Sequence, residues 1–185
     1  MRIVGGEARG RPLRAPAGDA TRPTADRIRQ SLFDRLGQRC DGLAVLDLYA
    51  GTGALALEAL SRGAARAVLV EQARPALEAI EKNIATLGYA DRCRLVRDDV
   101  KRALTALAAR HETFDLVFSD PPYALRAAQS TLDLLSTLGL LAVGARVVLE
   151  RDKREPAATP PAGYALVDER SYGDTSVDLF ERQIA

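Results

Sequence analysis

The sequence has few of the residues that metal sites and disulfide frameworks need. Two cysteines (Cys40 and Cys93) and one histidine (His111) occur in 185 residues. Disulfide-rich domains and Cys/His metal sites use several such residues at short spacings, so we expect neither, and no metal. No apolar run approaches the ~20 residues of a membrane-spanning helix, and the first residues lack an apolar signal segment. These absences predict a cytoplasmic, metal-free protein that does not bind a membrane.

The composition is otherwise that of an ordinary globular protein, with 47% hydrophobic and 28% charged residues. The length predicts a single domain, 1–185, and we expect a monomer. The net charge of +1 hides an uneven distribution, because residues 1–30 hold seven arginines, no lysine and three acidic residues. Arginine suits bidentate contact with phosphate, which predicts a nucleic-acid partner; a solvated basic tail is the alternative. The candidate RNA-binding residues are Arg2, Arg9, Arg11 and Arg22.

Residues 1–23 mix glycine, proline and arginine without any helical periodicity. We expect an extended arm or hairpin that is not an element of the folded core. Thr24 is the expected N-cap of a helix with an apolar stripe that reaches Gly37.

From residue 43 onward, apolar strands alternate with amphipathic helices. This alternation predicts an α/β fold with a doubly wound, mostly parallel sheet. The last two strands are joined by so short a turn that they must be antiparallel. The predicted strands are 43–48, 67–70, 94–96, 114–118, 146–150, 164–170 and 176–182, and the predicted helices are 24–36, 54–62, 75–87, 100–109 and 124–138.

A short motif, Asp120-Pro121-Pro122-Tyr123, follows the apolar run 114–118. The prolines end the strand, which places the motif at its carboxyl end, where open α/β sheets bind ligands. Asp120 and the proline carbonyls accept hydrogen bonds, and Tyr123 offers a flat face for stacking. This combination suits a planar ring with an exocyclic amino group: adenine, cytosine or guanine. A tight turn with Asp as its cap is the alternative.

A glycine-containing loop, residues 47–53, lies between the first predicted strand of the sheet and a helix. Gly51 and Gly53 let the backbone approach a ligand closely, and Glu71 at the next strand end can accept hydrogen bonds from a ribose. The loop also satisfies the dinucleotide pattern G-x-G-x-x-A, so a nicotinamide enzyme is an alternative. Asp47 counts against it, because a carboxylate would repel a pyrophosphate but could bind an ammonium group.

The order of these motifs resembles that of the S-adenosylmethionine-dependent amino-methyltransferases. A wider set of segments is similar to the bacterial family that methylates the 2-amino group of a guanine in small-subunit (16S) ribosomal RNA. That resemblance implies a seven-stranded sheet whose last strand is antiparallel. The segments are residues 2–6, 9–11, 22–24, 26–29, 46–59 and 172–175.

The resemblance also implies a cofactor, a partner and a set of site residues. The cofactor is S-adenosyl-L-methionine, and the partner is ribosomal RNA or a small-subunit particle. Either Asp98 or Asp99 binds the adenine, and Asp99 fits the pattern better. The implied catalytic residues are Asp120, Pro121, Pro122 and Tyr123, and the implied cofactor-binding residues are Asp47, Ala50, Gly51, Gly53, Glu71 and Asp99.

The expected reaction is methyl transfer to a guanine 2-amino group. Asp120 and the Pro121 carbonyl would accept the two amino hydrogens, while Tyr123 would hold an extruded base by stacking. Two alternatives remain: an adenine amino-methyltransferase that acts on DNA or RNA, and a non-catalytic RNA-binding assembly factor. Cys93 is interpreted as a core residue and not as a nucleophile.

Overall fold

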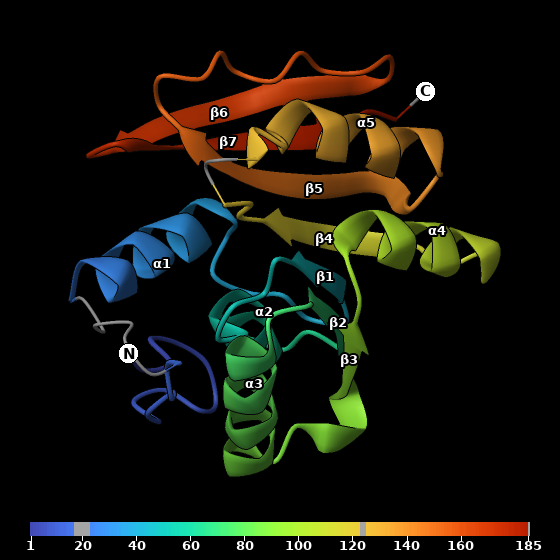
Figure 1. Ribbon diagram of the computed structural model, residues 1–185. Helices are drawn as coiled ribbons and strands as arrows, with labels where there is room; N and C mark the ends of the chain where they lie inside the picture. The colour runs from blue at the N-terminus through green and yellow to red at the C-terminus, as the bar shows by residue number, and fades with distance from the viewer. Residues whose placement is uncertain (17–22, 123–124, 185) are drawn as a thin grey trace.

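A computed structural model describes residues 1–16, 23–122 and 125–184 (Figure 1). Tyr123 and Arg22, both predicted site residues, therefore lie outside the described residues. The elements follow the predicted alternation of strand and helix. Their bounds are α1 (Pro23–Arg35), β1 (Ala44–Leu48), α2 (Ala54–Ser61), β2 (Arg66–Glu71), α3 (Arg74–Leu87), the 3-10 turn η1 (Ala90–Arg92), β3 (Cys93–Arg97), α4 (Val100–Ala109), β4 (Phe114–Ser119), α5 (Ala128–Thr137), β5 (Leu141–Asp152), β6 (Tyr164–Tyr172) and β7 (Thr175–Arg182).

All of these strands belong to one seven-stranded sheet in the order β3-β2-β1-β4-β5-β7-β6. The pairs from β3 to β5 are parallel, whereas β7 is antiparallel to both β5 and β6. The predicted doubly wound sheet and its antiparallel final hairpin are thus confirmed. Strand order reverses between β1 and β4, and in such sheets ligands bind in the crevice at the carboxyl ends of these two strands.

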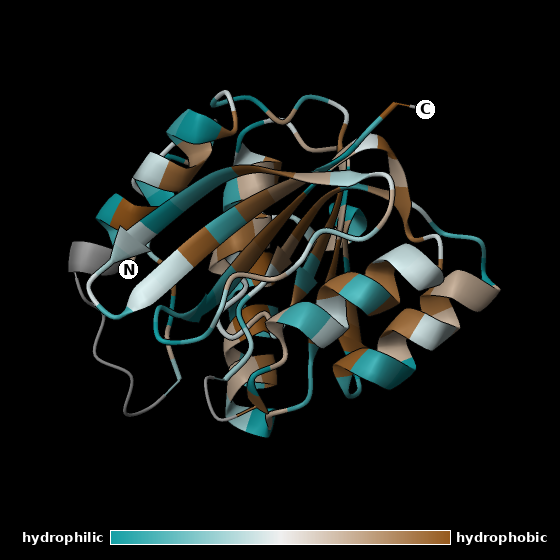
Figure 2. Cartoon of the chain, turned by 90° about the horizontal axis from the view of Figure 1, so that it is seen from above, coloured by the Kyte–Doolittle hydropathy of each residue, from teal (hydrophilic) through white to brown (hydrophobic). Residues whose placement is uncertain are grey.

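Helices cover the sheet on both faces, and each face has its own apolar core. On one face, side chains of α1, α2 and α3 pack against the strands. On the other face, side chains of α4 and α5 do so. Figure 2 shows the hydrophobic residues concentrated in the central strands between these layers. Among the described helices, none is both long and apolar enough to cross a bilayer.

The prediction that residues 1–23 contribute no core element is wrong for the first part of that segment. Ile3, Ala8 and Leu13 are at most 8% exposed and belong to the same core as α2. A bridge between Arg2 and Pro12 closes this stretch into a hairpin-like loop. We call residues 1–13 the N-terminal segment. Its apolar side chains recur every five residues, a spacing that neither helix nor strand periodicity predicts.

The N-terminal segment is held mainly by α2. The Glu58 carboxylate accepts hydrogen bonds from the backbone N–H groups of Val4 and Gly5, at 2.8 and 2.7 Å. The same fully buried carboxylate pairs with Arg62 at 2.8 Å and with Arg29 of α1 at 3.4 Å. Because a buried carboxylate needs both donors and counter-charges, Glu58 ties the segment, α1 and α2 into one unit.

Most element boundaries are shifted by one or two residues from those predicted, and the starts of α5 and β5 are shifted by more. α1 begins at Pro23, so Thr24 lies in its first turn and is not the N-cap. α5 begins at Ala128 because Arg126 has a φ of +44°, which is incompatible with a right-handed helix. β5 begins five residues before the predicted 146, and its pairing with β4 shifts register between Phe114 and Leu116. That irregularity interrupts the alternating pattern from which a strand is predicted.

Candidate active site

Four carboxylates lie at the carboxyl ends of adjacent strands and share one face of the sheet. They are Asp47 of β1, Glu71 of β2, Asp120 directly after β4, and Glu150 of β5. Two residues before each carboxylate, the strand has a side chain that packs in the core under α1 and α2. Residues two apart on a strand point to the same face of the sheet. All four therefore face the side that carries these helices. The residues that set this direction are Val45, Leu69, Phe118 and Val148.

A pocket of about 260 Å³ lies at this edge of the sheet. It brings together four predicted site residues from separate elements: Asp47, Ala50, Gly51 and Asp120. Gly53, Glu71 and Asp99 do not line it. Its other walls come from the glycine loop, α2, β5, the first residue of the chain and α1, namely Tyr49, Thr52, Ala54, Leu55, Glu150, Met1, Ile28, Arg29 and Leu32.

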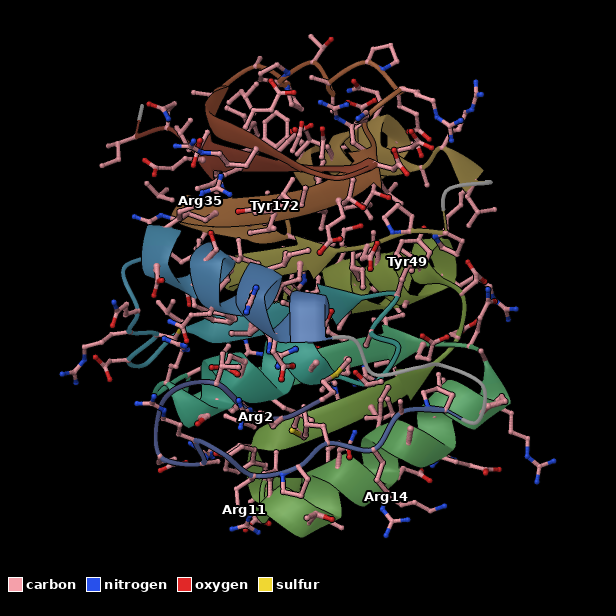
Figure 3. The ribbon with its side chains drawn as sticks, turned by 90° about the vertical axis from the view of Figure 1, so that its left-hand side faces the viewer. Arg2, Arg11, Arg14, Arg35, Tyr49 and Tyr172 are labelled. Atoms are coloured by element: carbon pink, nitrogen blue, oxygen red, sulfur yellow. The ribbon has the colours of Figure 1, made fainter. Side chains whose placement is uncertain are left out.

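The glycine loop bends sharply at the pocket. Tyr49, Gly51 and Gly53 have φ values of +57°, +58° and +73°. A side chain at Gly53 would place its Cβ only 2.9 Å from Leu69 Cδ2, so this position requires glycine. A left-handed tyrosine is uncommon, and such backbone conformations concentrate at ligand sites. Tyr49, on the face of the molecule shown in Figure 3, lies inside the predicted loop 47–53 and is a pocket residue that the sequence does not single out.

Glu71 fixes the glycine loop to the end of β2. Its Oε2 accepts a hydrogen bond from Gly51 N at 2.9 Å, and its Oε1 accepts two more from Gln72 N and Ala73 N, both at 2.8 Å. A carboxylate has about four acceptor positions, so the capacity for one further hydrogen bond is left. The role of Glu71 as a ribose acceptor stays a prediction.

Asp98 and Asp99 lie at the same edge of the sheet, beyond β2. Asp99 is the N-cap of α4, where its Oδ1 accepts a hydrogen bond from Arg102 N at 3.0 Å. Asp98 Oδ1 accepts one from Asp99 N at 2.9 Å, and the Arg102 guanidinium lies within 3.7 Å of both carboxylates. The role of one of these two carboxylates as the acceptor for an adenine stays a prediction.

The pocket carboxylates resist ionisation chiefly because the surrounding protein shields them from water, and to a lesser degree because they lie close together. Burial raises the pKa of Asp47 to about 8, with smaller contributions from the charges of Asp120 and Glu71, against a lowering hydrogen bond from Ala56 N. Burial also raises the pKa of Glu150 to about 8, and Asp120 and Asp47 add to this effect. Asp120 is open to solvent on its pocket side, yet the surrounding protein raises its pKa to about 6. A ligand that brings positive charge or hydrogen-bond donors relieves this repulsion.

The two prolines after Asp120 differ in their surroundings. Pro121 is buried and Pro122 is exposed. The Pro122 carbonyl accepts a hydrogen bond from Leu125 N at 2.8 Å, which closes the turn. The Pro121 carbonyl receives none from the described residues. Of the two carbonyls in the predicted acceptor set, that of Pro121 is therefore the one free to meet a ligand.

Three of the predicted RNA-binding arginines, Arg2, Arg9 and Arg11, belong to the N-terminal segment, and Figure 3 shows Arg2 and Arg11 on one face of the molecule. Arg2 and Arg9 line a groove of about 440 Å³ between the N-terminal segment and α1, together with Arg27. Asp26 also lines the groove and lies 3.8 Å from Arg2. Arg11 lies outside the groove and donates a hydrogen bond to the Thr86 carbonyl of α3.

Glu150 and Arg29 are pocket residues that the sequence reasoning missed. A signal for Glu150 existed, because the predicted strand 146–150 ends on a carboxylate, and Asp47, Glu71 and Asp120 lie within two residues of the ends of their predicted strands. No comparable signal pointed to Arg29. It enters the pocket wall only because α1 packs across the end of the sheet, where its guanidinium pairs with Glu58 and Asp26.

Comparison with known proteins assigns the chain to a family. Residues 1–181 match the family described as Conserved hypothetical protein 95. The Ribosomal RNA small subunit methyltransferase D of Escherichia coli K12 is 38% identical over 183 residues, which cover 99% of this chain and 90% of that protein. The Bacillus subtilis protein YlbH is 33% identical over 183 residues, covering 99% and 100% of the two chains. The solved structure of Escherichia coli yhhF matches with a TM-score of 0.86 and 34% identity, over 100% of this chain and 99% of that one. The chain therefore belongs to the Conserved hypothetical protein 95 family and has its seven-stranded α/β methyltransferase fold.

Proposed function

We propose that this protein transfers a methyl group from S-adenosylmethionine to the 2-amino group of a guanine in small-subunit ribosomal RNA. The observation that carries the proposal is the pocket that joins the glycine loop to Asp47 and Asp120. The relative from Escherichia coli, named for methylation of small-subunit ribosomal RNA, supports the substrate class.

The chemistry of the pocket fits this cofactor. S-adenosylmethionine supplies the methyl group and carries a net positive charge, which suits a site crowded with carboxylates whose pKa values are raised. Asp47 would hold the ammonium group. Ala50, Gly51 and Gly53 would let the backbone approach the cofactor closely, Glu71 would accept a hydrogen bond from the ribose, and Asp99 would do so from the adenine.

Asp120 and the Pro121 carbonyl would act on the acceptor amine. A guanine 2-amino group is a weak nucleophile because its lone pair is delocalised into the ring. Two acceptors that each take one amino hydrogen favour a pyramidal nitrogen, whose lone pair can then point toward the methyl group. The buried Pro121 and the hydrogen bond from Leu125 N to the Pro122 carbonyl keep these acceptors rigid. Tyr123 would stack on the extruded base, at ~1–3 kcal/mol per base.

The groove between the N-terminal segment and α1 would hold the RNA backbone. Arg9 and Arg27 form no ion pair within the described ranges, so their charges are available to phosphate groups. Arg2 shares the groove, and Arg11 and Arg22 would extend the contact. Met1, Ile28 and Arg29 of the same two segments line the pocket itself, so the groove leads toward the predicted site of methyl transfer.

The test is a methylation assay with purified protein, S-adenosylmethionine and unmodified small ribosomal subunits, followed by mass spectrometry of the RNA nucleosides. We expect N2-methylguanine at one position, and its absence from the RNA of cells that lack the protein. N6-methyladenine would support the adenine enzyme instead. Cofactor binding without any methylated nucleoside, measured by titration calorimetry, would support an assembly factor.

A further inference from the structure

Glu150 is the immediate neighbour of Asp120 across two parallel strands. Ser119 of β4 is paired with Leu149 of β5, so Asp120 and Glu150 are the next residues along strands that lie ~4.8 Å apart. Both carboxylates line the same pocket. The charge of Asp120 also contributes to the raised pKa of Glu150. Glu150 is therefore placed to touch whatever ring Asp120 holds.

Neither of these two carboxylates has a hydrogen-bond donor within the described part of the chain. Their neighbours differ in this respect, since Asp47 accepts from Ala56 N and Glu71 from Gly51 N. The next residue in β5, Arg151, does not serve them, because it pairs with Asp178 at 2.7 Å. Acceptors that are shut off from water in folded proteins nearly always find donors. A base that fills the pocket and displaces its water must therefore supply the donors itself.

Guanine has three adjacent hydrogens on its Watson–Crick edge: N1–H and the two of its 2-amino group. Adenine and cytosine have an acceptor ring nitrogen beside their amino group. Glu150 is ionised above its pKa of about 8, and an ionised carboxylate opposite that nitrogen would face another acceptor and would be left unpaired. The acceptors at this site occur in the matching order, with Glu150 on β5, Asp120 after β4, and then the carbonyl of Pro121.

We propose that Glu150 accepts a hydrogen bond from guanine N1–H and thereby selects guanine over bases whose corresponding nitrogen is an acceptor. The inference rests on the proposed function, because it requires the base to be held at Asp120. A contact from Glu150 would provide a preference for guanine that the Asp-Pro-Pro-Tyr motif cannot provide by itself, because that motif accepts any exocyclic amine. Sites that leave a buried polar group unpaired against the wrong substrate can discriminate by ~10⁴-fold or more.

The test uses an RNA fragment that contains the methylated nucleotide, with guanine or 2,6-diaminopurine at that position. Diaminopurine keeps the 2-amino group but has an acceptor at N1. Above pH 8, where Glu150 is ionised, the wild-type protein should favour guanine by at least ~100-fold in kcat/KM. Glu150→Gln should narrow this ratio by at least ~10-fold, because its amide N–H can donate to N1. Glu150→Ala should lose activity on guanine without gaining it on diaminopurine. In equilibrium binding, which involves no turnover, the wild-type protein should likewise bind the guanine RNA more tightly than the diaminopurine RNA.

Glu78→Gln, on the exposed surface of α3, is the matched control and should keep the wild-type ratio. A Glu150→Gln protein that makes N2-methylguanine with an unchanged ratio would overturn the inference and leave the proposed function intact. If Glu150→Gln lowers the affinity for S-adenosylmethionine, Glu150 belongs to the cofactor site, and this result would also overturn the inference. A wild-type protein that makes no N2-methylguanine would overturn the proposed function, and the inference with it.

Discussion

A single buried carboxylate, Asp47, couples ligand binding to the stability of the free protein. The unfolded chain releases its proton near the ordinary pKa of 3.8, whereas the folded protein holds it up to a pKa of about 8. A group whose pKa is raised on folding makes the folded state bind more protons, so stability falls as pH rises through this window. The residue that would hold the ammonium group is thus a cost to the free protein above neutral pH.

We therefore expect Asp47→Asn to be more stable than wild type at pH 8, by about 0.5–2 kcal/mol, and to differ little at pH 4. The asparagine oxygen can still accept the hydrogen bond from Ala56 N, so the loop should be preserved. Affinity for S-adenosylmethionine should fall, because the attraction to ammonium is removed. Urea denaturation at several pH values and titration calorimetry measure both effects. Parallel stability curves for the two proteins would contradict the raised pKa.

For Asp120 we expect a substitution to lower turnover without lowering the affinity for the cofactor. Asp120→Ala should lower kcat/KM by about 10²–10³-fold, the usual effect of removing one polar group that stabilises a transition state. The cofactor dissociation constant should stay close to that of wild type, because Asp120 is proposed to face the amine. Asp133→Ala, on the exposed face of α5, provides the control. Equal losses in turnover and cofactor affinity would place Asp120 in the cofactor site.

At the scale of the elements, the N-terminal segment behaves as a structural part of the domain. Ile3 is fully buried in the core that α2 and α3 share, so Ile3→Ala should lower the free energy of unfolding by about 2–4 kcal/mol. Val143→Ala, at a position of β5 that is 62% exposed, should change it by less than about 0.5 kcal/mol. Equal effects in urea denaturation would show that the segment is a peripheral arm.

The sheet could be predicted from the sequence because its strands are continuous apolar runs separated by well-marked helices. The strand-end acceptors Asp47, Glu71 and Asp120 could be predicted for the same reason, since a carboxylate at the end of a buried run stands out, although Glu150 was missed. Two kinds of feature could not be predicted from the sequence. The packing of Ile3 and Ala8 depends on acceptors in α2 that bond to Val4 N and Ala8 N from more than fifty residues away. The contribution of α1 to the pocket depends on how that helix crosses the sheet, which no local pattern encodes.

At the scale of the whole molecule, the small net charge gives no indication of the basic groove that we propose binds RNA. The net charge is only +1, yet the groove beside α1 is lined by Arg2, Arg9 and Arg27 against Asp26 alone. Binding at such a groove should depend on salt, because each phosphate that meets an arginine releases counterions.

We expect Arg9→Gln combined with Arg27→Gln to weaken RNA binding and to flatten the dependence of log K on log salt by ~0.7–0.9 for each phosphate group that the variant no longer binds. Both side chains are exposed and unpaired within the described residues, so the fold should be unaffected. The control is Lys101→Gln combined with Arg110→Gln, which removes the same amount of positive charge from α4 and its C-cap, away from the groove. The same flattening in the control would show that overall charge, and not this groove, attracts the RNA.

The place of β7 in the sheet sets the order in which the protein can assemble during synthesis. β7 is the last of the strands in chain order, yet it lies between β5 and β6 and is the only neighbour of β6 among the described strands. β6 leaves the ribosome first and has no partner until β7 follows. The N-terminal segment likewise waits for Glu58 and Ser61 before its backbone N–H groups are satisfied. At ~5–20 residues per second, the first segment stays unpaired for several seconds, and the sheet closes only after β7 has been synthesised.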